Sequence, residues 1–169
     1  MGNARTWEIR PIADEELPTV TRVFGPARLF TERVRLQQQN RGVLLVAWHG
    51  AEPVGTVYVW LDEAEEPELR RHLPGVPLLV HLRVAEAVQN NGVGTALVAE
   101  AERQLRRRGY SSVALGVGPD DHRAESFYRR LRYAEWSHGE IPTRSEFANG
   151  DGDWVSTADR CRVFAKNLD

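Results

Sequence analysis

The sequence predicts a single α/β domain, and three observations support this fold class. The chain has 169 residues, a length that fits one domain with a substantial buried core. Segments with the character of strands are interleaved with segments that have the apolar periodicity of helices. We find no internal repeat and no low-complexity linker, so we expect one domain over residues 1–169.

The composition is that of an ordinary soluble protein, with 41% hydrophobic and 27% charged residues. A formal net charge of -2 indicates no strongly basic surface, so we expect no nucleic-acid partner. The apolar runs are far shorter than the roughly 20 residues that span a bilayer, so we expect no membrane partner either. The single cysteine, Cys161, cannot form an internal disulfide, which favours a reducing compartment such as the cytoplasm.

In the first part of the chain, turn and capping residues separate the elements. Asp14 suits a helix N-cap, and Gly25-Pro26 is a pair that ends one helix before the next begins. The turn at residues 49–53 joins two strands into a hairpin. We therefore expect strands over residues 7–10, 43–48 and 54–60, and helices after Asp14 and over residues 27–39.

In the second part, a long amphipathic helix is followed by Gly109, which suits a C-terminal cap. The remaining elements follow from alternation, periodicity and the distribution of Gly and Pro. We expect strands over residues 78–84, 112–117 and 162–165, helices over residues 95–108 and 122–131, and irregular segments over residues 62–68, 72–77 and 138–153.

The strand after the long helix has two unequal faces. Val113, Leu115 and Val117 alternate along one face, whereas the other face carries only Ala114 and Gly116. Such a bare face leaves room for a bound ligand or for a closely packed helix.

The loop Gln89-Asn90-Asn91-Gly92-Val93-Gly94-Thr95 lies between a predicted strand and a predicted helix. Its glycines allow positive φ angles and the close approach of a ligand. The first amides of the following helix lack partners within the helix, and together with the helix dipole they suit a phosphate group. The loop is therefore a candidate pyrophosphate cradle, although glycines in this spacing also occur in ordinary tight turns.

Two other phosphate-binding motifs fit less well. A Walker loop needs a Lys followed by Ser or Thr, and Gly94 is followed by Thr95 and Ala96, which excludes it. A dinucleotide fingerprint needs a third Gly or Ala where Leu97 stands, and an acidic residue nearer than Asp120. That motif is disfavoured.

Residues 78–136 resemble the central motif of the GNAT family of N-acetyltransferases. The matching segments are the strand end Leu82-Arg83-Val84, the loop from Gln89 to Gly94, and the helix that carries Asp121, Ala124 and Tyr128, followed by Leu131-Arg132-Tyr133. The resemblance extends loosely over nearly the whole chain. Asp121 stands where the family has Asn, which we interpret as a helix N-cap. Arg132 stands where the family has Gly, which indicates a different turn.

The resemblance implies a mixed, mostly antiparallel sheet that is splayed between its two central strands and flanked by helices. In this family the pantetheine arm of the acyl donor lies between those strands, so the resemblance implies acetyl-CoA as the donor. It further implies that three groups of residues hold the donor: Leu82, Arg83 and Val84; Gln89, Asn90, Asn91, Gly92, Val93, Gly94 and Thr95; and Asp121, Ala124 and Tyr128.

The resemblance also implies direct transfer of the acetyl group to a primary amine, with Tyr128 as the general acid that protonates the departing thiolate. The Val84 N–H is the expected oxyanion donor, worth roughly 3 kcal/mol in rate. Tyr128 also falls on the apolar stripe of its helix, so a structural role is the alternative. Cys161 has no His nearby in sequence to activate it, so we do not expect covalent catalysis.

The general base stays open at the level of sequence. His81 on the central strand is one candidate, because an imidazole can take a proton directly or through water. Glu63, Glu65 and Glu66 in the acidic loop are the others, and they would favour a cationic acceptor. No pair among the five histidines has the short spacing of a zinc ligand set, so we expect no metal.

The sequence does not identify the acceptor, which could be a small-molecule or a peptide amine, nor does it distinguish acetyl-CoA from a longer acyl-CoA. A homodimer is expected from the family resemblance alone. A non-catalytic acyl-CoA-binding module is the alternative function, and the presence of Tyr128 argues against it.

Overall fold

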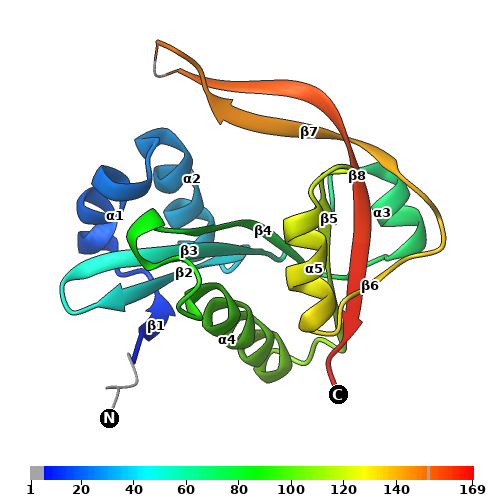
Figure 1. The fold of residues 1–169 in the computed structure, drawn as a ribbon, viewed down its shortest axis with the longest axis horizontal. Helices are drawn as coiled ribbons and strands as arrows, with labels where there is room; N and C mark the ends of the chain where they lie inside the picture. The colour runs from blue at the N-terminus through cyan, green and yellow to red at the C-terminus, as the bar shows by residue number, and fades with distance from the viewer. Residues whose placement is uncertain (1–5, 152) are drawn as a thin grey trace.

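The structure, a computed structural model, describes residues 6–151 and 153–169. It confirms the predicted α/β fold class, with helices on both sides of a sheet (Figure 1). Strands from both ends of the described chain, β1 (Glu8–Pro11) and β8 (Trp154–Asn167), belong to this sheet.

The other elements lie between these two strands. The helices are α1 (Leu17–Phe24), α2 (Ala27–Gln38), α3 (Pro67–His72), α4 (Val93–Arg107) and α5 (His122–Arg130), with short 3-10 turns at Asp14–Glu16 and Glu86–Val88. The strands are β2 (Gly42–His49), β3 (Glu52–Trp60), β4 (Leu78–Val84), β5 (Ser112–Val117), β6 (Ala134–Glu135) and β7 (Ile141–Ala148).

The strands lie side by side in the order β1-β2-β3-β4-β5-β8-β6, and β7 pairs with β8 off this path. All of these pairs are antiparallel except β4 with β5, which is parallel. The expected mixed, mostly antiparallel sheet is therefore confirmed.

Helices cover the two faces of the sheet through separate cores. Leu97 and Leu105 of α4 share one apolar cluster with Leu45 of β2. Phe30 of α2 belongs to a second cluster, together with Leu44 of the same strand. Because side chains alternate along a strand, neighbouring residues of β2 serve opposite cores, and α4 and α2 lie on opposite faces.

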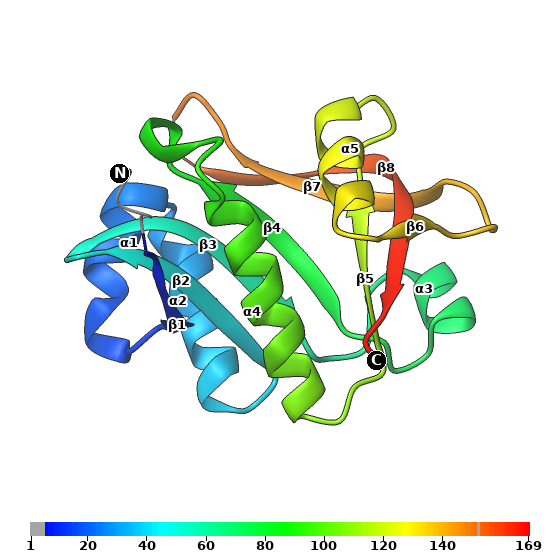
Figure 2. The ribbon, with the colours of Figure 1, turned by 60° about the horizontal axis from the view of Figure 1, so that its bottom comes forward.

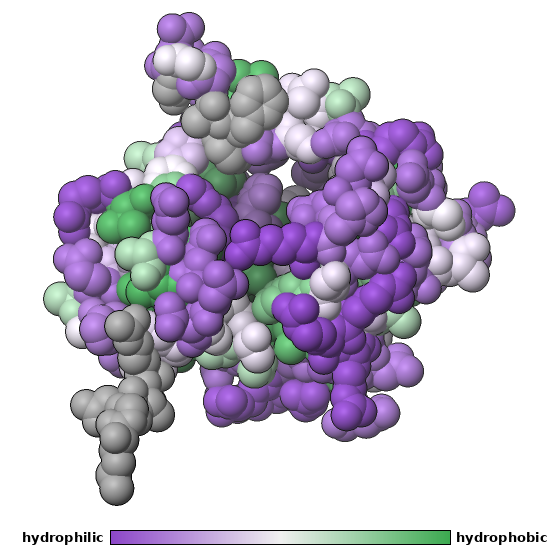
Figure 3. All heavy atoms as spheres, in the orientation of Figure 1, coloured by the Kyte–Doolittle hydropathy of each residue, from purple (hydrophilic) through white to green (hydrophobic). Residues whose placement is uncertain are grey.

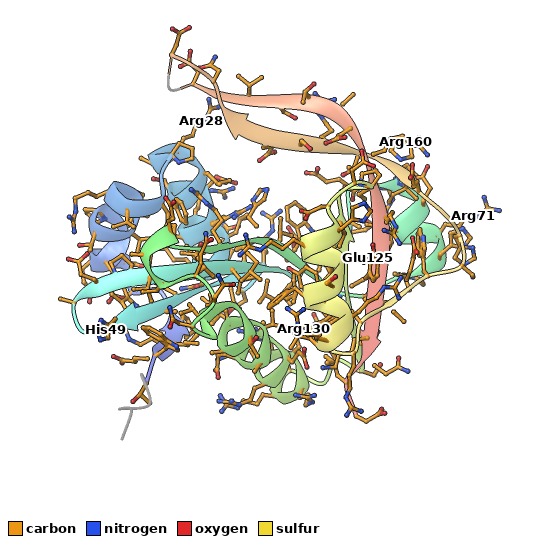
Figure 4. All side chains as sticks on the ribbon, in the orientation of Figure 1. Arg28, His49, Arg71, Glu125, Arg130 and Arg160 are labelled. Carbon is orange, nitrogen blue, oxygen red and sulfur yellow. The ribbon has the colours of Figure 1, made fainter. Side chains whose placement is uncertain are left out.

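Ion pairs hold α5 against the last strand. Arg162 of β8 donates to the Glu125 carboxylate of α5 at 2.6 and 3.0 Å, and to Glu135 of β6 at 2.8 Å. Figure 4 shows Glu125 on α5 beside β8. This anchoring fixes the helix that carries Tyr128.

Several predicted boundaries are corrected. Residues 141–148, expected in a loop, form β7, whose every residue pairs with one in the first part of β8. The half-buried residues of β7 include Thr143 and Ser145, so the apolar alternation that identifies a strand is missing. β8 begins at Trp154 rather than at residue 162. α3 was also missed, although Pro67 at its first turn is a usual start signal.

A smaller correction concerns a helix start: α4 begins at Val93, two residues before the expected position. After α5, Arg132 has a φ of 74°, the left-handed conformation that Gly adopts most easily. Among the described residues, no helix has the length and apolar character needed to cross a bilayer.

Candidate active site

β4 and β5 form a gap in the centre of the sheet. They pair at one position only, Leu78 with Ala114, and the Ala114 N–H donates to the Pro77 carbonyl at 3.0 Å. Beyond this point the strands diverge, and Figure 2 shows the wedge between them. The expected splay is confirmed, and in the described part of the chain it leaves the facing edges of both strands without a partner strand.

The backbone of Val84 faces this gap. The Ala85 N–H donates to the Val54 carbonyl of β3 at 2.9 Å. In an antiparallel pair, successive residues point alternately toward and away from the neighbouring strand, so Val84 points its N–H and carbonyl toward β5. The Gln89 side chain donates to that carbonyl at 3.2 Å. By the same alternation, Arg83 faces β3 with its backbone.

A β-bulge precedes this segment. The register between β3 and β4 shifts between Thr56 and Tyr58, which lie opposite the region of His81 and Leu82. His81 has a φ of 53°, which is uncommon for a residue with a Cβ. Bulges redirect side chains, and here the bulge lies where the edge of β4 opens onto the gap.

The start of α4 presents the amides expected of a phosphate cradle. Gly92 precedes the helix with a φ of 85°, and its carbonyl accepts from the Ala96 N–H at 3.0 Å. The N–H groups of Val93, Gly94 and Thr95 come before this bond, so they have no partner within the helix. A Cβ built on Gly92 would meet no atom within 4 Å, so the space around it is open. These donors fit a pyrophosphate group.

The remaining loop residues brace the cradle. The Asn91 side chain donates to the Gln89 carbonyl at 3.2 Å. Asn90 has a φ of 65°, and its side-chain oxygen accepts from Arg123 of α5 at 3.4 Å. The loop and the start of α5, which are far apart in the sequence, are therefore brought together.

The start of α5 is capped as expected. The Asp121 carboxylate accepts from the Ala124 N–H at 3.0 Å, which confirms the N-cap interpretation. Ala124 packs against the core on the α4 side of the sheet. The Phe127 ring lies 3.3 Å from the position that a Cβ on Gly94 would occupy, so α5 also touches the cradle.

Tyr128 is half-buried on α5, in edge contact with Phe127 and Tyr133 at ring-centroid distances of 5.0 and 5.6 Å. Burial, with a smaller contribution from the Asp121 charge, raises the pKa of Tyr128 to about 12. The phenol therefore keeps its proton at neutral pH and can donate it. Tyr128 packs on the α4-side core and does not line either of the two cavities described next.

A cavity of about 380 Å³ opens beside the gap, between β5 and the β7–β8 hairpin. Figure 3 shows the surface hollowed below the hairpin. We call this space the acidic cavity because its wall carries four acidic and three basic side chains: Glu65, Glu66, Glu146 and Asp159 against Arg33, Arg144 and Arg160. Glu63, also expected at the mouth, is exposed and pairs with Arg70 at 3.7 Å.

The bare face of β5 borders the acidic cavity at Gly116 rather than a helix. A Cβ on Gly116 would lie 3.1 Å from the Cys161 Sγ. Burial, the largest effect, raises the pKa of the Cys161 thiol to about 11, so the thiol stays protonated at neutral pH. This protonation is unfavourable for a nucleophile.

A second cavity of about 690 Å³ lies between β4 and the connection of α1 to α2. We call it the basic cavity because Arg22, Arg33 and Arg83 line it with a single carboxylate, Glu146. The Arg83 Nη1 donates to the carbonyls of Phe24 and Gly25 at 2.5 and 3.0 Å, which ties the connection to β4.

His81 lies where the two cavities meet and is bonded to Arg33 of α2. The Arg33 Nη2 donates to the His81 Nδ1 at 2.5 Å. A guanidinium cannot accept, so Nδ1 supplies the lone pair and the neutral ring carries its proton on Nε2. Burial, followed by the charges of Arg33 and Arg83, lowers the pKa of His81 to about 4. The ring is therefore neutral at pH 7.

His81 was expected in the site from the sequence, whereas Arg33 and Glu146 were not. One signal was available for Arg33: it falls at the helical spacing of Phe30 and Val34, and all three residues are buried on α2. Glu146 lies on the missed strand β7 and had no comparable signal. Among the described residues, no group of three or more His, Cys, Asp or Glu could hold a metal ion.

Comparison with known proteins connects this geometry to one family. A family model described as the Acetyltransferase (GNAT) family matches residues 7–133. A comparison with curated protein sequences finds no match.

Similar solved structures include the ribosomal-protein-S18-alanine N-acetyltransferase of Escherichia coli, with a TM-score of 0.67, 17% identity, and coverage of 96% of this chain and 94% of that one. A GNAT family acetyltransferase of Elizabethkingia anophelis with acetyl-CoA bound has a TM-score of 0.63 and 13% identity, with coverage of 96% of this chain and 98% of that one. The PaiA N-acetyltransferase of Thermoplasma acidophilum in complex with coenzyme A has a TM-score of 0.62 and 14% identity, with coverage of 96% of this chain and 99% of that one. At these identities the likeness shows a shared fold.

Proposed function

We propose that this chain, which belongs to the GNAT family of acetyltransferases, moves an acetyl group from acetyl-CoA directly to a primary amine. The protein is an acyl-CoA-dependent acetyltransferase because it belongs to this family. The observation that supports the finer proposal is the gap between β4 and β5, which has a phosphate cradle on one side and a charged cavity on the other.

In this proposal the donor lies along the gap. The free amides of Val93, Gly94 and Thr95 hold its pyrophosphate, and the loop from Gln89 to Gly92 shapes the approach. The Val84 N–H binds the thioester oxygen and stabilises the charge that develops there. Leu82 and Arg83 contribute through the strand that presents Val84, and Asp121 and Ala124 through the start of α5.

Tyr128 is the proposed general acid. The amine nitrogen bonds to the acetyl carbon, the carbon–sulfur bond breaks, and the phenol proton passes to the departing thiolate. With a pKa of about 12 the phenol is protonated throughout the neutral range, so it can donate a hydrogen bond to the sulfur as negative charge develops there. Tyr128 packs beside Phe127, whose ring touches the cradle at Gly94.

The proton that the amine loses needs a separate acceptor. His81 was the expected base, but its Nδ1 already accepts from Arg33 and its low pKa makes it a weak one. Glu66 is the better candidate: it lines the acidic cavity and accepts from the Thr143 hydroxyl at 2.9 Å. We propose that Glu66 takes the proton through water, with His81 as the alternative.

The test compares Tyr128→Phe with wild type in an amine screen with acetyl-CoA. We expect kcat to fall roughly 10² to 10⁴-fold, the usual contribution of a placed acid. The acetyl-CoA Kd should change much less than kcat, because phenylalanine keeps the aromatic ring and loses only the hydroxyl. Tyr110→Phe is the matched control, because Tyr110 is also partly buried against the same core. A kcat within a few-fold of wild type would remove Tyr128 from the chemistry.

The same screen separates the alternative function. Binding of acetyl-CoA without turnover of any amine would indicate a non-catalytic acyl-CoA-binding module. A cytoplasmic location and a homodimer stay predictions, which fractionation and sedimentation would check.

A further inference from the structure

A buried arginine lies where the two cavities meet. Arg33 is only 5% exposed, on the face of α2 that also carries Phe30 and Val34. It nevertheless lines both the acidic and the basic cavity. Burying a guanidinium is costly unless its charge and its donors are used, so the position calls for a function.

The two side chains in direct contact with Arg33, Tyr58 and His81, hold it in place without neutralising it. Its guanidinium carbon lies 4.6 Å from the centroid of the Tyr58 ring, a cation–π contact, and one N–H donates to His81. Neither partner carries negative charge at pH 7. Glu146 on β7 supplies the nearby carboxylate charge, and its side chain is exposed.

The charges around the site are divided in space. Arg33 and Glu146 line both cavities. Apart from these two, the acidic cavity, which borders the gap at Gly116, has three acidic and two basic side chains, whereas the described lining of the basic cavity has two arginines and no carboxylate. A molecule that reaches from one cavity into the other meets Arg33 on its way, and it gains most if it is positive at one end and negative at the other.

We propose that Arg33 binds a carboxylate of the acceptor, so that the acetylated amine belongs to an amino acid. This inference rests on the proposed acetyl transfer and specifies the acceptor for it. The amine end lies in the acidic cavity, near Glu66 and the gap, and the carboxylate lies against the Arg33 guanidinium. Arginine suits this role because its fixed fork can hold both carboxylate oxygens at once.

The His81 contact gives Arg33 one orientation. The bulge at His81 and the bond to Nδ1 fix where the remaining N–H groups of Arg33 point. His81 is then a positioning residue, which explains why a histidine with an occupied lone pair stands at the centre of the site.

Wild-type protein provides the first test, and it needs no variant. We would measure kcat/KM with acetyl-CoA for the twenty common L-amino acids and for the amine that each gives on decarboxylation. We expect the best amino acid to exceed its decarboxylated partner by roughly 100-fold, because a buried charge pair is lost with the carboxylate. Equal or faster turnover of the amines would overturn the inference and leave the proposed function standing.

Variants locate the effect at Arg33. Arg33→Gln should raise the KM of the best amino acid about 100-fold and leave its decarboxylated partner within about 3-fold. Arg33→Lys keeps the charge but not the fork, so an intermediate loss is expected. Arg35→Gln is the control, because Arg35 is exposed on the same helix and pairs with Glu32.

Calorimetry keeps the two proposals separate. The acetyl-CoA Kd of Arg33→Gln should match wild type, and a single cooperative thermal transition should show that the variant is folded. An equal loss for both members of a substrate pair, with acetyl-CoA binding intact, would contradict the inference alone. Acetyl-CoA binding by wild type without turnover of any amine or amino acid would instead remove the proposed function, and the inference with it.

Discussion

The two sides of the gap between β4 and β5 present different kinds of polar group to a ligand. We call the side with α4 the cradle side and the side with the two cavities the acceptor side. On the α4 side, the polar groups offered to a ligand are backbone amides at Val93, Gly94 and Thr95, next to an apolar core. On the other side, the groups offered are charged side chains, among them Arg33 and Glu66. Backbone donors suit a ligand part that never changes, such as a pyrophosphate, whereas side chains can change to select an acceptor.

The two sides also differ in their effect on stability. Helix-start amides are unpaired in any helix, so a cradle made from them adds little cost. A buried guanidinium does carry a cost, and burial lowers the pKa of Arg33 to about 10. We infer that the buried charges on the acceptor side lower the free energy of unfolding.

The largest expected effect is a pH dependence of the free energy of unfolding, and it comes from the buried His81. Folding lowers the pKa of His81 from about 6.5 to about 4, so between these values the unfolded chain binds a proton that the folded chain refuses. The contribution of neutral His81 to the free energy of unfolding is therefore fully present above pH 6.5. It is lost as the pH falls toward 4, by about 3 kcal/mol in total. His81→Gln, whose carbonyl can still accept from Arg33, should flatten this part of the profile.

Urea denaturation between pH 7 and pH 4.5 would measure it. His122→Gln is the control, because His122 is exposed at the start of α5. If the free energy of unfolding fell equally with pH in wild type and in His81→Gln, His81 would not be buried as described.

A smaller effect is expected on the cradle side. Gly92 and Gly109 lie at opposite ends of α4 with φ angles of 85° and 86°, and a Cβ on either would meet no atom within 4 Å. Alanine at each position should cost a similar 1–2 kcal/mol of stability through backbone strain. Only Gly92→Ala should weaken acetyl-CoA binding, by roughly tenfold, because it distorts the amides that we propose bind phosphate.

Calorimetry on the two variants gives the comparison directly. An equal Kd for both would show that the start of α4 does not hold the donor.

The sequence was informative on the cradle side for a physical reason. Its determinants are local: two glycines, a helix start and an N-cap lie within short stretches of the chain, and each has a recognisable spacing. The splay of β4 and β5 followed from the family resemblance, and the unequal faces of β5 fitted it.

The acceptor side was largely hidden because its determinants are not local. Arg33, His81 and Glu146 come from three separate elements, and only the folded sheet brings them together. β7 is held by pairing with β8 rather than by an apolar pattern of its own, so its sequence predicts a loop and gives no signal for Glu146.

The most direct test of the central claim is a calorimetric titration of the protein with acetyl-CoA, with NAD as the comparison ligand. Micromolar binding of acetyl-CoA, roughly -8 kcal/mol, and none of NAD is the result that the cradle predicts. An absence of heat and of any thermal shift with acetyl-CoA would contradict it, because the amides at the start of α4 would then serve no donor.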